Sequence, residues 1–224
     1  MIEWVIIGGY VLSMTAILIL SLGQLHLTWH YRQSKSKLKS APELVSYPKV
    51  TVQLPVFNEL YVIERLIDKV SQLDYPKDKL EIQLLDDSTD ETTQLIADKI
   101  RDYQSLGFDI IHVRRPERSG FKAGALQYGI EHTDSEFLAI FDADFLPEKD
   151  FLKKTLPYFQ NAEVGMVQTR WGHLNKDYSV LTRLQAFGLD GHFTVEQGGR
   201  NNAGSFINFN GTAGVWRKQC IQEA

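Results

Sequence analysis

The sequence contains a single cysteine, Cys220, and no excess of basic residues. One cysteine excludes an intrachain disulfide and a cysteine-rich zinc site, which fits a domain in a reducing compartment. The chain has 24 Lys and Arg against 28 Asp and Glu, a formal net charge of -4. Because binding to a phosphate backbone normally requires a concentrated basic surface, this composition argues against nucleic acid as a partner.

Two common phosphate-binding loops are also missing. No G-x-G-x-x-G follows the first apolar run of the globular part, and no G-x-x-x-x-G-K-[ST] occurs in the chain. These loops mark dinucleotide oxidoreductases and P-loop NTPases, so neither enzyme class is expected.

Charge is absent from one stretch near the amino terminus, between Trp4 and Leu22. About 19 helical residues at 1.5 Å each span about 28 Å, the thickness of a bilayer core. We therefore expect a transmembrane anchor over residues 1–32. A cleaved signal peptide is the main alternative, but Glu3 replaces the usual basic start and the apolar run is longer than usual.

Basic residues follow the apolar stretch and set its expected orientation: Arg32, Lys35, Lys37 and Lys39. The positive-inside rule places them in the cytoplasm, so the amino terminus would lie outside and the catalytic domain in the cytoplasm. Residues 33–48 are polar and contain two prolines, as expected of a linker between membrane and domain. The domain itself is expected over residues 49–224.

Short apolar runs alternate with helical spacing in the domain. Strands are predicted at residues 50–54, 80–85, 108–113 and 137–141. Helical periodicity is found over residues 60–70, 95–103 and 123–130, and Asp90 is the expected N-cap of the second helix. This alternation indicates βαβ units, hence a three-layer α/β fold with a mostly parallel sheet.

The polar motifs of the domain come directly after its predicted strands. They are "PVFNE" (55–59), "DDSTD" (86–90), "RRPERSGFKAGAL" (114–126) and "DADF" (142–145). In an open parallel sheet the carboxyl ends of the strands share one edge, where ligands bind. We therefore expect the four motifs to form one site.

Asp142 and Asp144 stand one residue apart at the end of the fourth predicted strand. Two close carboxylates repel each other unless a proton or cation lies between them. Mg2+ or Mn2+, held by one or two carboxylates and by substrate phosphates, removes this repulsion. The alternative is a turn with two solvated aspartates.

Two other motifs offer groups suited to a nucleotide. Asp86 and Asp87 can accept hydrogen bonds from a base imide or a ribose hydroxyl, although "DDSTD" is also a good turn sequence. Lys122 lies between Gly120 and Gly124 where a helix is expected to begin, so its ammonium and the free backbone N–H groups can address a phosphate. A solvated lysine is the alternative.

Taken in order, "PVFNE", "DDSTD", "RSGFKAGAL", "FDADF" and "FNGTAGVWRK" resemble the catalytic domain of glycosyltransferase family 2, in its cellulose-synthase-like group. The likeness is greatest to the mannan and glucan synthase branch, which carries a stretch similar to "HFTVEQ" (192–197) before "FNGTAGVWR". The resemblance covers nearly the whole chain from Lys49 onward.

This resemblance implies a nucleotide-binding fold of the GT-A type and an inverting, metal-dependent transfer of a hexose to a growing β-linked polysaccharide. The donor would be UDP-glucose or GDP-mannose. It further implies that Asn58, Glu59, Asp86, Asp87, Lys122 and Asp142 bind the nucleotide sugar, and that Asp142 and Asp144 hold Mg2+ or Mn2+. The acceptor side would be formed by Asn210, Gly211, Thr212 and Trp216, although Trp216 is equally explained as a core aromatic residue.

Two features of the family pattern are missing from the sequence: the acidic Thr-Glu-Asp motif that supplies the general base, and the later Gln-x-x-Arg-Trp motif. "QTRW" (168–171) has one residue where that motif needs two. Asp190 and Glu196 are the nearest carboxylates, and neither is expected to act as the base. We therefore expect the donor-binding portion of a longer enzyme, with the catalytic base unknown.

Three other functions were weighed. An aspartate-nucleophile phosphatase also has Asp-x-Asp after a strand, but it needs Thr or Val where this chain has Leu146. A non-catalytic, membrane-tethered fragment that binds nucleotide sugars is a second alternative. A transferase that uses a glycolipid or other lipid acceptor at the membrane is the third.

Overall fold

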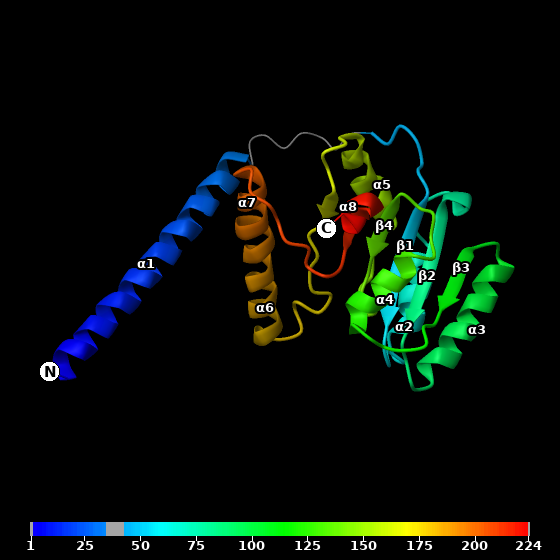
Figure 1. Cartoon of the computed structure of the whole chain (residues 1–224), viewed down its shortest axis with the longest axis horizontal. Coiled ribbons are helices and arrows are strands. Elements are labelled where there is room, and N and C mark those ends of the chain that lie inside the picture. The colour runs from blue at the N-terminus through cyan, green and yellow to red at the C-terminus, as the bar shows by residue number, and fades with distance from the viewer. Residues whose placement is uncertain (1, 35–42, 224) are drawn as a thin grey trace. The chain divides into compact units, whose positions relative to one another are not determined.

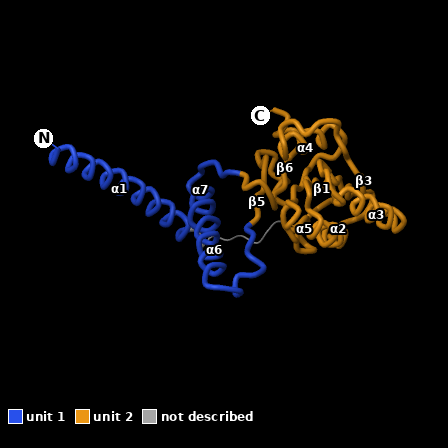
Figure 2. The backbone as a smooth tube through the Cα atoms, turned by 90° about the horizontal axis from the view of Figure 1, so that it is seen from below, with its two compact units in different colours: residues 1–40, 170–208 blue, residues 41–169, 209–224 orange. Residues whose placement is uncertain are grey.

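The computed structural model describes residues 2–34 and 43–223 (Figure 1). Contacts divide the chain into two compact units, residues 1–40 with 170–208 and residues 41–169 with 209–224 (Figure 2). Residues 35–42, which include much of the predicted linker and three lysines of the basic cluster, lie outside the described residues. The predicted boundaries after residues 32 and 48 stay predictions.

The larger unit is built on a six-stranded sheet with the order β3-β2-β1-β4-β6-β5. β1 pairs in parallel with β2 and β4, β2 pairs in parallel with β3, and β6 runs antiparallel to β4 and β5. The strands are β1 Val50–Val56, β2 Leu80–Asp86, β3 Asp109–Val113, β4 Phe137–Ile140, β5 Met166–Gln168 and β6 Gly214–Arg217. The predicted α/β fold with a mostly parallel sheet is confirmed.

Helices cover both faces of this sheet. The α-helices of the larger unit are α2 Ile63–Val70, α3 Thr92–Ser105, α4 Phe121–Ile130, α5 Phe151–Thr155 and α8 Lys218–Gln222. Two 3-10 helices, η2 Lys77–Lys79 and η3 Leu156–Gln160, complete the unit. α2 and α3 contact one another, whereas α4 contacts β1 and β2. The chain adds β2 and β3 on one side of β1 and then returns to add β4 on the other side. Because the crossovers are right-handed, α2 and α3 lie on one face of the sheet and α4 lies on the other.

The face of the sheet under α4 carries buried polar side chains. The amides of Gln53 and Gln83 share a hydrogen bond of 3.1 Å, and Gln83 also donates to Glu81 over 2.8 Å. A Cβ on Gly129 would lie 2.5 Å from Gln53 Nε2 and 2.8 Å from Gln83 Oε1. Glycine at this position therefore lets α4 approach the strands closely, and that close approach fixes the position of Lys122 in its first turn.

One helix start differs from its prediction by a residue. α3 begins at Thr92, with Glu91 in the N-cap position. Asp90 stands just before it and accepts a hydrogen bond of 3.0 Å from the Thr92 N–H through its carboxylate. Asp90 thus satisfies a free N–H of the first turn, although it is not the N-cap residue itself.

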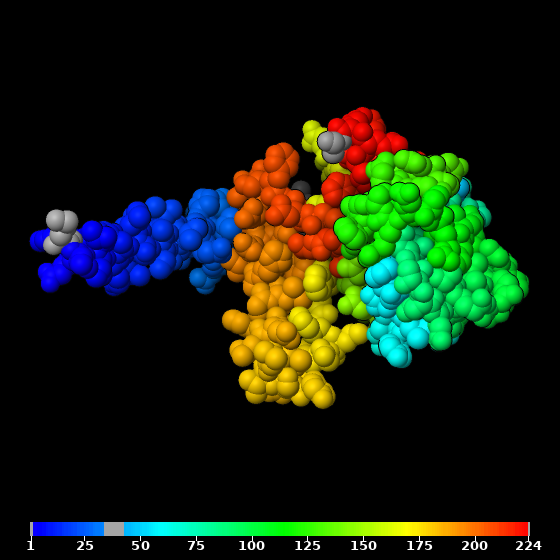
Figure 3. Space-filling model, turned by 60° about the horizontal axis from the view of Figure 1, so that its bottom comes forward, coloured from blue at the N-terminus to red at the C-terminus, as the bar shows by residue number. Residues whose placement is uncertain are grey.

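The smaller unit contains the long helix α1 Ile2–Ser34 together with α6 Val180–Gly191, the π-helix η4 His192–Gln197 and α7 Gly198–Asn202. Among the described residues one helix, Ile2–Gln33, is long and apolar enough to cross a membrane, and its most apolar window is not buried. Figure 3 shows α1 in blue with its side chains uncovered along most of its length. A Cβ on Gly199 would lie 2.6 Å from Leu27 O, so glycine allows α7 to pack closely against α1.

Candidate functional site

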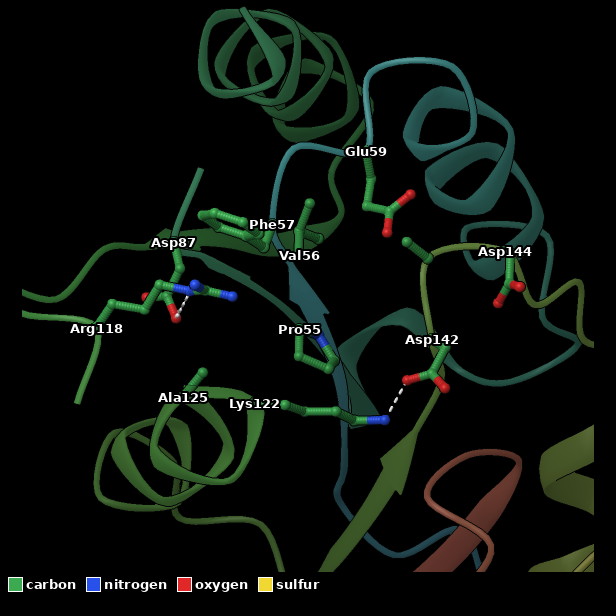
Figure 4. Close-up of a pocket in the computed structure, with 11 residues that line it drawn as sticks. Pro55, Val56, Phe57, Glu59, Asp87, Arg118, Lys122, Ala125, Asp142 and Asp144 are labelled. Atoms are coloured by element: carbon green, nitrogen blue, oxygen red, sulfur yellow. Dashed lines mark hydrogen bonds and ion pairs between the residues drawn. The ribbon is translucent and has the colours of Figure 1, made fainter. Parts of the chain in front are cut away.

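A pocket of about 340 Å³ lies at the carboxyl edge of the sheet (Figure 4). Its walls come from the end of β1 and the loop after it, from the loops that follow β2 and β4, and from the first half of α4 with the segment that leads into it. The lining residues are Pro55, Val56, Phe57, Glu59, Asp87, Arg118, Lys122, Ala125, Asp142, Ala143 and Asp144. The structure therefore brings together one residue or more from each of the four polar motifs.

Asp142 and Asp144 form the acidic side of the pocket, directly after β4. The Asp142 N–H donates to Thr212 Oγ1 over 2.9 Å, which orients the turn, while the Asp142 carboxylate accepts from Lys122. Asp144 is exposed. Partial burial raises the pKa of Glu59, and the negative charges of Asp144 and Asp142 raise it further.

The donor set of this side fits a hard divalent ion. In the part of the chain that the structure describes, no cluster of three or more His, Cys, Asp and Glu is arranged to hold a metal by itself. Magnesium-like ions bound with substrate phosphates need only one or two protein carboxylates. Asp142 and Asp144 supply two, and the mutual repulsion of the nearby acids favours a cation between them.

Lys122 reaches the acidic side from the first turn of α4. Gly120 precedes that helix with φ 68°, a left-handed conformation that glycine adopts without strain. The Lys122 ammonium donates to the Asp142 carboxylate and, over 2.8 Å, to the carbonyl oxygen of Gly211. One flexible cation therefore connects the carboxylate pair with the segment before β6.

Asp87 lies on the opposite side of the pocket, after β2. Arg115 holds its carboxylate with two hydrogen bonds, from Nε to Oδ1 over 2.8 Å and from Nη2 to Oδ2 over 2.6 Å. The same guanidinium donates to the backbone carbonyls of Ser119 and Phe121. Arg115 thereby fixes both Asp87 and the loop that leads into α4.

Asp86 does not line the pocket, because it is the last residue of β2 and its side chain is fully buried. Burial alone would raise the pKa of Asp86, but hydrogen bonds from His112 and Ser88 outweigh it and lower the pKa to about 2. Asn58 is also outside the pocket lining; its side chain accepts from the Thr89 N–H over 2.9 Å and joins the first two loops. In this structure the side chains of Asp86 and Asn58 stabilise the loops around the pocket.

We expect Asp86 to make stability depend on pH in the acid range. Its pKa of about 2 in the folded protein lies below the ordinary value of 3.8, so its contribution to the free energy of unfolding is present above pH 3.8 and is lost as the pH falls through 2. The shift corresponds to about 2 kcal/mol. In urea unfolding of the wild type and Asp86→Asn at decreasing pH, the difference between their free energies of unfolding should become smaller. Parallel curves for the two proteins would rule out this role.

The segment before β6 approaches the pocket through its backbone and a hydroxyl group. Gly211 and Thr212 contact Lys122 and Asp142 as described, and the Asn210 N–H donates to Gln168 Oε1 over 2.9 Å. Trp216 lies within β6 and its ring packs against Phe209 with 5.5 Å between ring centres. Residues 210–212 therefore lie at the edge of the site, whereas Trp216 packs against another aromatic side chain.

Asp190 and Glu196, which are not expected to act as the general base, belong to the smaller unit. Asp190 pairs with Arg170, and Glu196 Oε2 lies 2.7 Å from His192 Nδ1. Glu196 Oε1 also lies 3.9 Å from Arg200 Nη2. Both carboxylates are therefore engaged in ion pairs or hydrogen bonds within that unit.

Sequence reasoning missed three residues of the site: Phe57, Arg115 and Arg118. The Arg118 guanidinium carbon lies 3.4 Å from the centre of the Phe57 ring, and its Nε lies 3.9 Å from Asp87 Oδ2. The three arginines within "RRPERSGFKAGAL", of which Arg115 and Arg118 belong to the site, were the available signal, since guanidinium groups commonly bind phosphates, carboxylates and aromatic faces.

Comparison with known proteins gives consistent results. The family model described as "Glycosyl transferase family 2" matches residues 51–220. The probable glucomannan 4-beta-mannosyltransferase 4 of Oryza sativa subsp. japonica is 45% identical over 187 residues, which are 81% of this chain and 34% of that protein. The glucomannan 4-beta-mannosyltransferase 1 of Cyamopsis tetragonoloba is 43% identical over 195 residues, with 85% and 36% covered. The chain thus spans about a third of the length of these curated relatives.

A solved structure shares the fold. It is the mannosyltransferase PcManGT from Pyrobaculum calidifontis in complex with GDP-Man and Mn2+, with a TM-score of 0.70 and 26% identity, covering 92% of this chain and 56% of that one. The GT-A type of the fold is therefore confirmed, and so is the resemblance to the mannan and glucan synthase branch. The chain belongs to glycosyl transferase family 2.

Proposed function

We propose that this chain is the donor-binding part of a membrane-anchored mannosyltransferase that transfers mannose from GDP-mannose to a growing β-linked polysaccharide. The observation that carries the proposal is the pocket in which Asp87, Lys122, Asp142 and Asp144 meet. The relatives named as glucomannan mannosyltransferases support mannose as the sugar. The complex of the similar structure with GDP-Man supports guanosine diphosphate as the carrier.

The acidic side of the pocket would hold the diphosphate end of the donor. Asp142 and Asp144 would bind Mg2+ or Mn2+, which would neutralise the negative charge that develops on the departing diphosphate. Lys122 would donate to a phosphate oxygen from the first turn of α4, where its ammonium already lies beside the Asp142 carboxylate. The Mn2+ in the complex of the similar structure supports a divalent ion as the cofactor.

The opposite side of the pocket would hold the nucleoside. Asp87 would accept hydrogen bonds from the base or the ribose, and Arg115 keeps its carboxylate in a fixed orientation. Asn58 and Asp86 would support the loops around the nucleoside, and Glu59 would face the donor from the β1 side. A donor stretched between the two sides would therefore contact all four loops.

The acceptor would approach from the segment that contains Asn210, Gly211 and Thr212, which already borders Lys122 and Asp142. A β-linkage formed from an α-linked nucleotide sugar requires inversion at the anomeric carbon, so we infer an inverting transfer. In this arrangement α1 anchors the protein in the membrane, with the amino terminus outside and the pocket in the cytoplasm.

Release of GDP from GDP-mannose tests this proposal. The mannosyltransferase of which we propose this chain is the donor-binding part is purified in detergent with its helix α1 and incubated with Mn2+, a donor and mannan oligosaccharides as acceptors. We expect GDP release that depends on the acceptor, with GDP-mannose preferred to UDP-glucose. Tight Mn2+-dependent binding of GDP-mannose without release would instead identify a nucleotide-sugar-binding protein without transferase activity, and release only with lipid acceptors would reassign the acceptor.

A further inference from the structure

The pocket contains a guanidinium group that the proposed metal and phosphate contacts do not use. Arg118 lines the pocket on the side of Asp87, away from the Asp142 and Asp144 pair (Figure 4). Its side chain is 39% exposed, so it remains accessible to a ligand. Two neighbours restrict it, the ring of Phe57 and the carboxylate of Asp87.

These two contacts hold the guanidinium in one orientation. The Arg118 guanidinium carbon lies 3.4 Å from the Phe57 ring centre, a close cation–π contact, and 5.0 Å from the ring centre of Phe121. Its Nε lies 3.9 Å from Asp87 Oδ2, which is itself held by Arg115. The partly exposed Arg118 guanidinium therefore lies on an aromatic support beside the Asp87 carboxylate, which lines the pocket with 7% of its side chain exposed.

This pair matches one base better than the other candidate. Guanine presents two adjacent acceptors, O6 and N7, which an arginine binds with two hydrogen bonds. Its neighbouring N1–H and amino group are donors that suit a carboxylate. Uracil has a single N–H between two carbonyl groups, so a carboxylate that accepts from this N–H is repelled by a neighbouring carbonyl oxygen. Uracil also lacks a second acceptor beside its carbonyl group, so the arginine can form only one of its two hydrogen bonds.

We propose that Arg118, supported on Phe57 and placed beside Asp87, reads the base of the nucleotide donor and selects guanine over uracil. The inference rests on the proposed function, because it assigns the nucleoside to this side of the pocket. It adds a specificity-determining residue that contacts the base, and it gives Phe57 the role of fixing the arginine.

The experiment compares binding of GDP, UDP and inorganic pyrophosphate, each with Mn2+, by calorimetry on the purified chain. For Arg118→Gln we expect GDP affinity to fall on the order of 10-fold to 100-fold, with UDP and pyrophosphate affinities unchanged. Arg118→Lys should lose as much GDP affinity, since lysine keeps the charge but not the fork. Arg101→Gln is the control, because Arg101 is an exposed arginine of α3, outside the pocket lining, and its ion pair is with Asp98.

The outcomes separate the claims. An equal loss for all three ligands would make Arg118 a phosphate-binding residue and overturn the inference. Unchanged GDP affinity in both Arg118 variants would overturn it as well. If the wild-type chain bound pyrophosphate and neither nucleotide, or bound none of the three, the proposed function itself would fail. Retained pyrophosphate binding in the variants shows that the pocket is folded.

Discussion

Replacing Asp144 by Asn is expected to weaken Mn2+-dependent binding of GDP by more than about 100-fold while leaving the stability of the fold nearly unchanged. Asp144 is exposed and lies in the loop after β4, so its substitution disturbs no core packing. The amide keeps the size of the side chain and removes the charge that a hard divalent ion requires. Calorimetric titration of GDP with and without Mn2+ measures the effect.

A matched variant distinguishes this effect from a general loss of negative charge. Asp78→Asn changes an exposed aspartate of η2, outside the pocket lining, and should bind GDP as the wild type does. If Asp144→Asn kept the full Mn2+ dependence of GDP binding, the assignment of the metal to this carboxylate pair would be wrong.

The second large effect is expected from Lys122→Met, which should lower GDP affinity by about 10-fold to 100-fold, the cost of a lost hydrogen bond to a charged group. Methionine keeps the length of the side chain and removes the ammonium that lies beside Asp142 and donates to Gly211. The loss should appear for GDP and pyrophosphate alike and be absent for guanosine, because the nucleoside would bind on the Asp87 side. Calorimetry with the three ligands measures it.

Lys122 has a second expected consequence in the segment before β6. Since the hydrogen bond to the Gly211 carbonyl is lost, the backbone amides of residues 209–213 should exchange hydrogen faster in Lys122→Met. Lys149→Met is the control, because Lys149 is exposed and lies outside the pocket lining. An unchanged GDP affinity in Lys122→Met would contradict the phosphate role of this lysine.

The strand pattern of the sequence was sufficient to predict the central sheet. Runs of Val, Ile and Leu begin and end within two residues of β1 to β4, because buried parallel strands require continuous apolar or well-paired side chains. The short strands β5 and β6 were not predicted. Each has only a few residues, and β6 includes Trp216 within a motif that also suggested an acceptor site.

The candidate site was predictable to the extent that it depends on topology. Asp87, Lys122, Asp142 and Asp144 follow strands whose carboxyl ends lie at one edge, and the structure gathers them in one pocket. The same rule cannot tell Asp87, which lines the pocket, from its neighbour Asp86, which does not, because both stand at the end of β2 and successive side chains there point in opposite directions.

Contacts between side chains of different loops could not be predicted from the sequence. Arg115 and Asp87 are 28 residues apart, and nothing in either motif alone indicates their bidentate pair. The stacking of Arg118 on Phe57 likewise depends on the loops after β1 and β3 meeting at the sheet edge. Such pairs follow from three-dimensional packing, which local spacing does not encode.

The most direct test of the central claim is the position of a Mn2+ ion in crystals of the chain grown with GDP. Anomalous diffraction locates the ion without reference to the protein density. We predict one peak within about 2.2 Å of carboxylate oxygens of Asp142 or Asp144 and of the diphosphate of GDP. A GDP molecule bound elsewhere, or a Mn2+ ion that avoids both carboxylates while GDP occupies the pocket, would contradict the account.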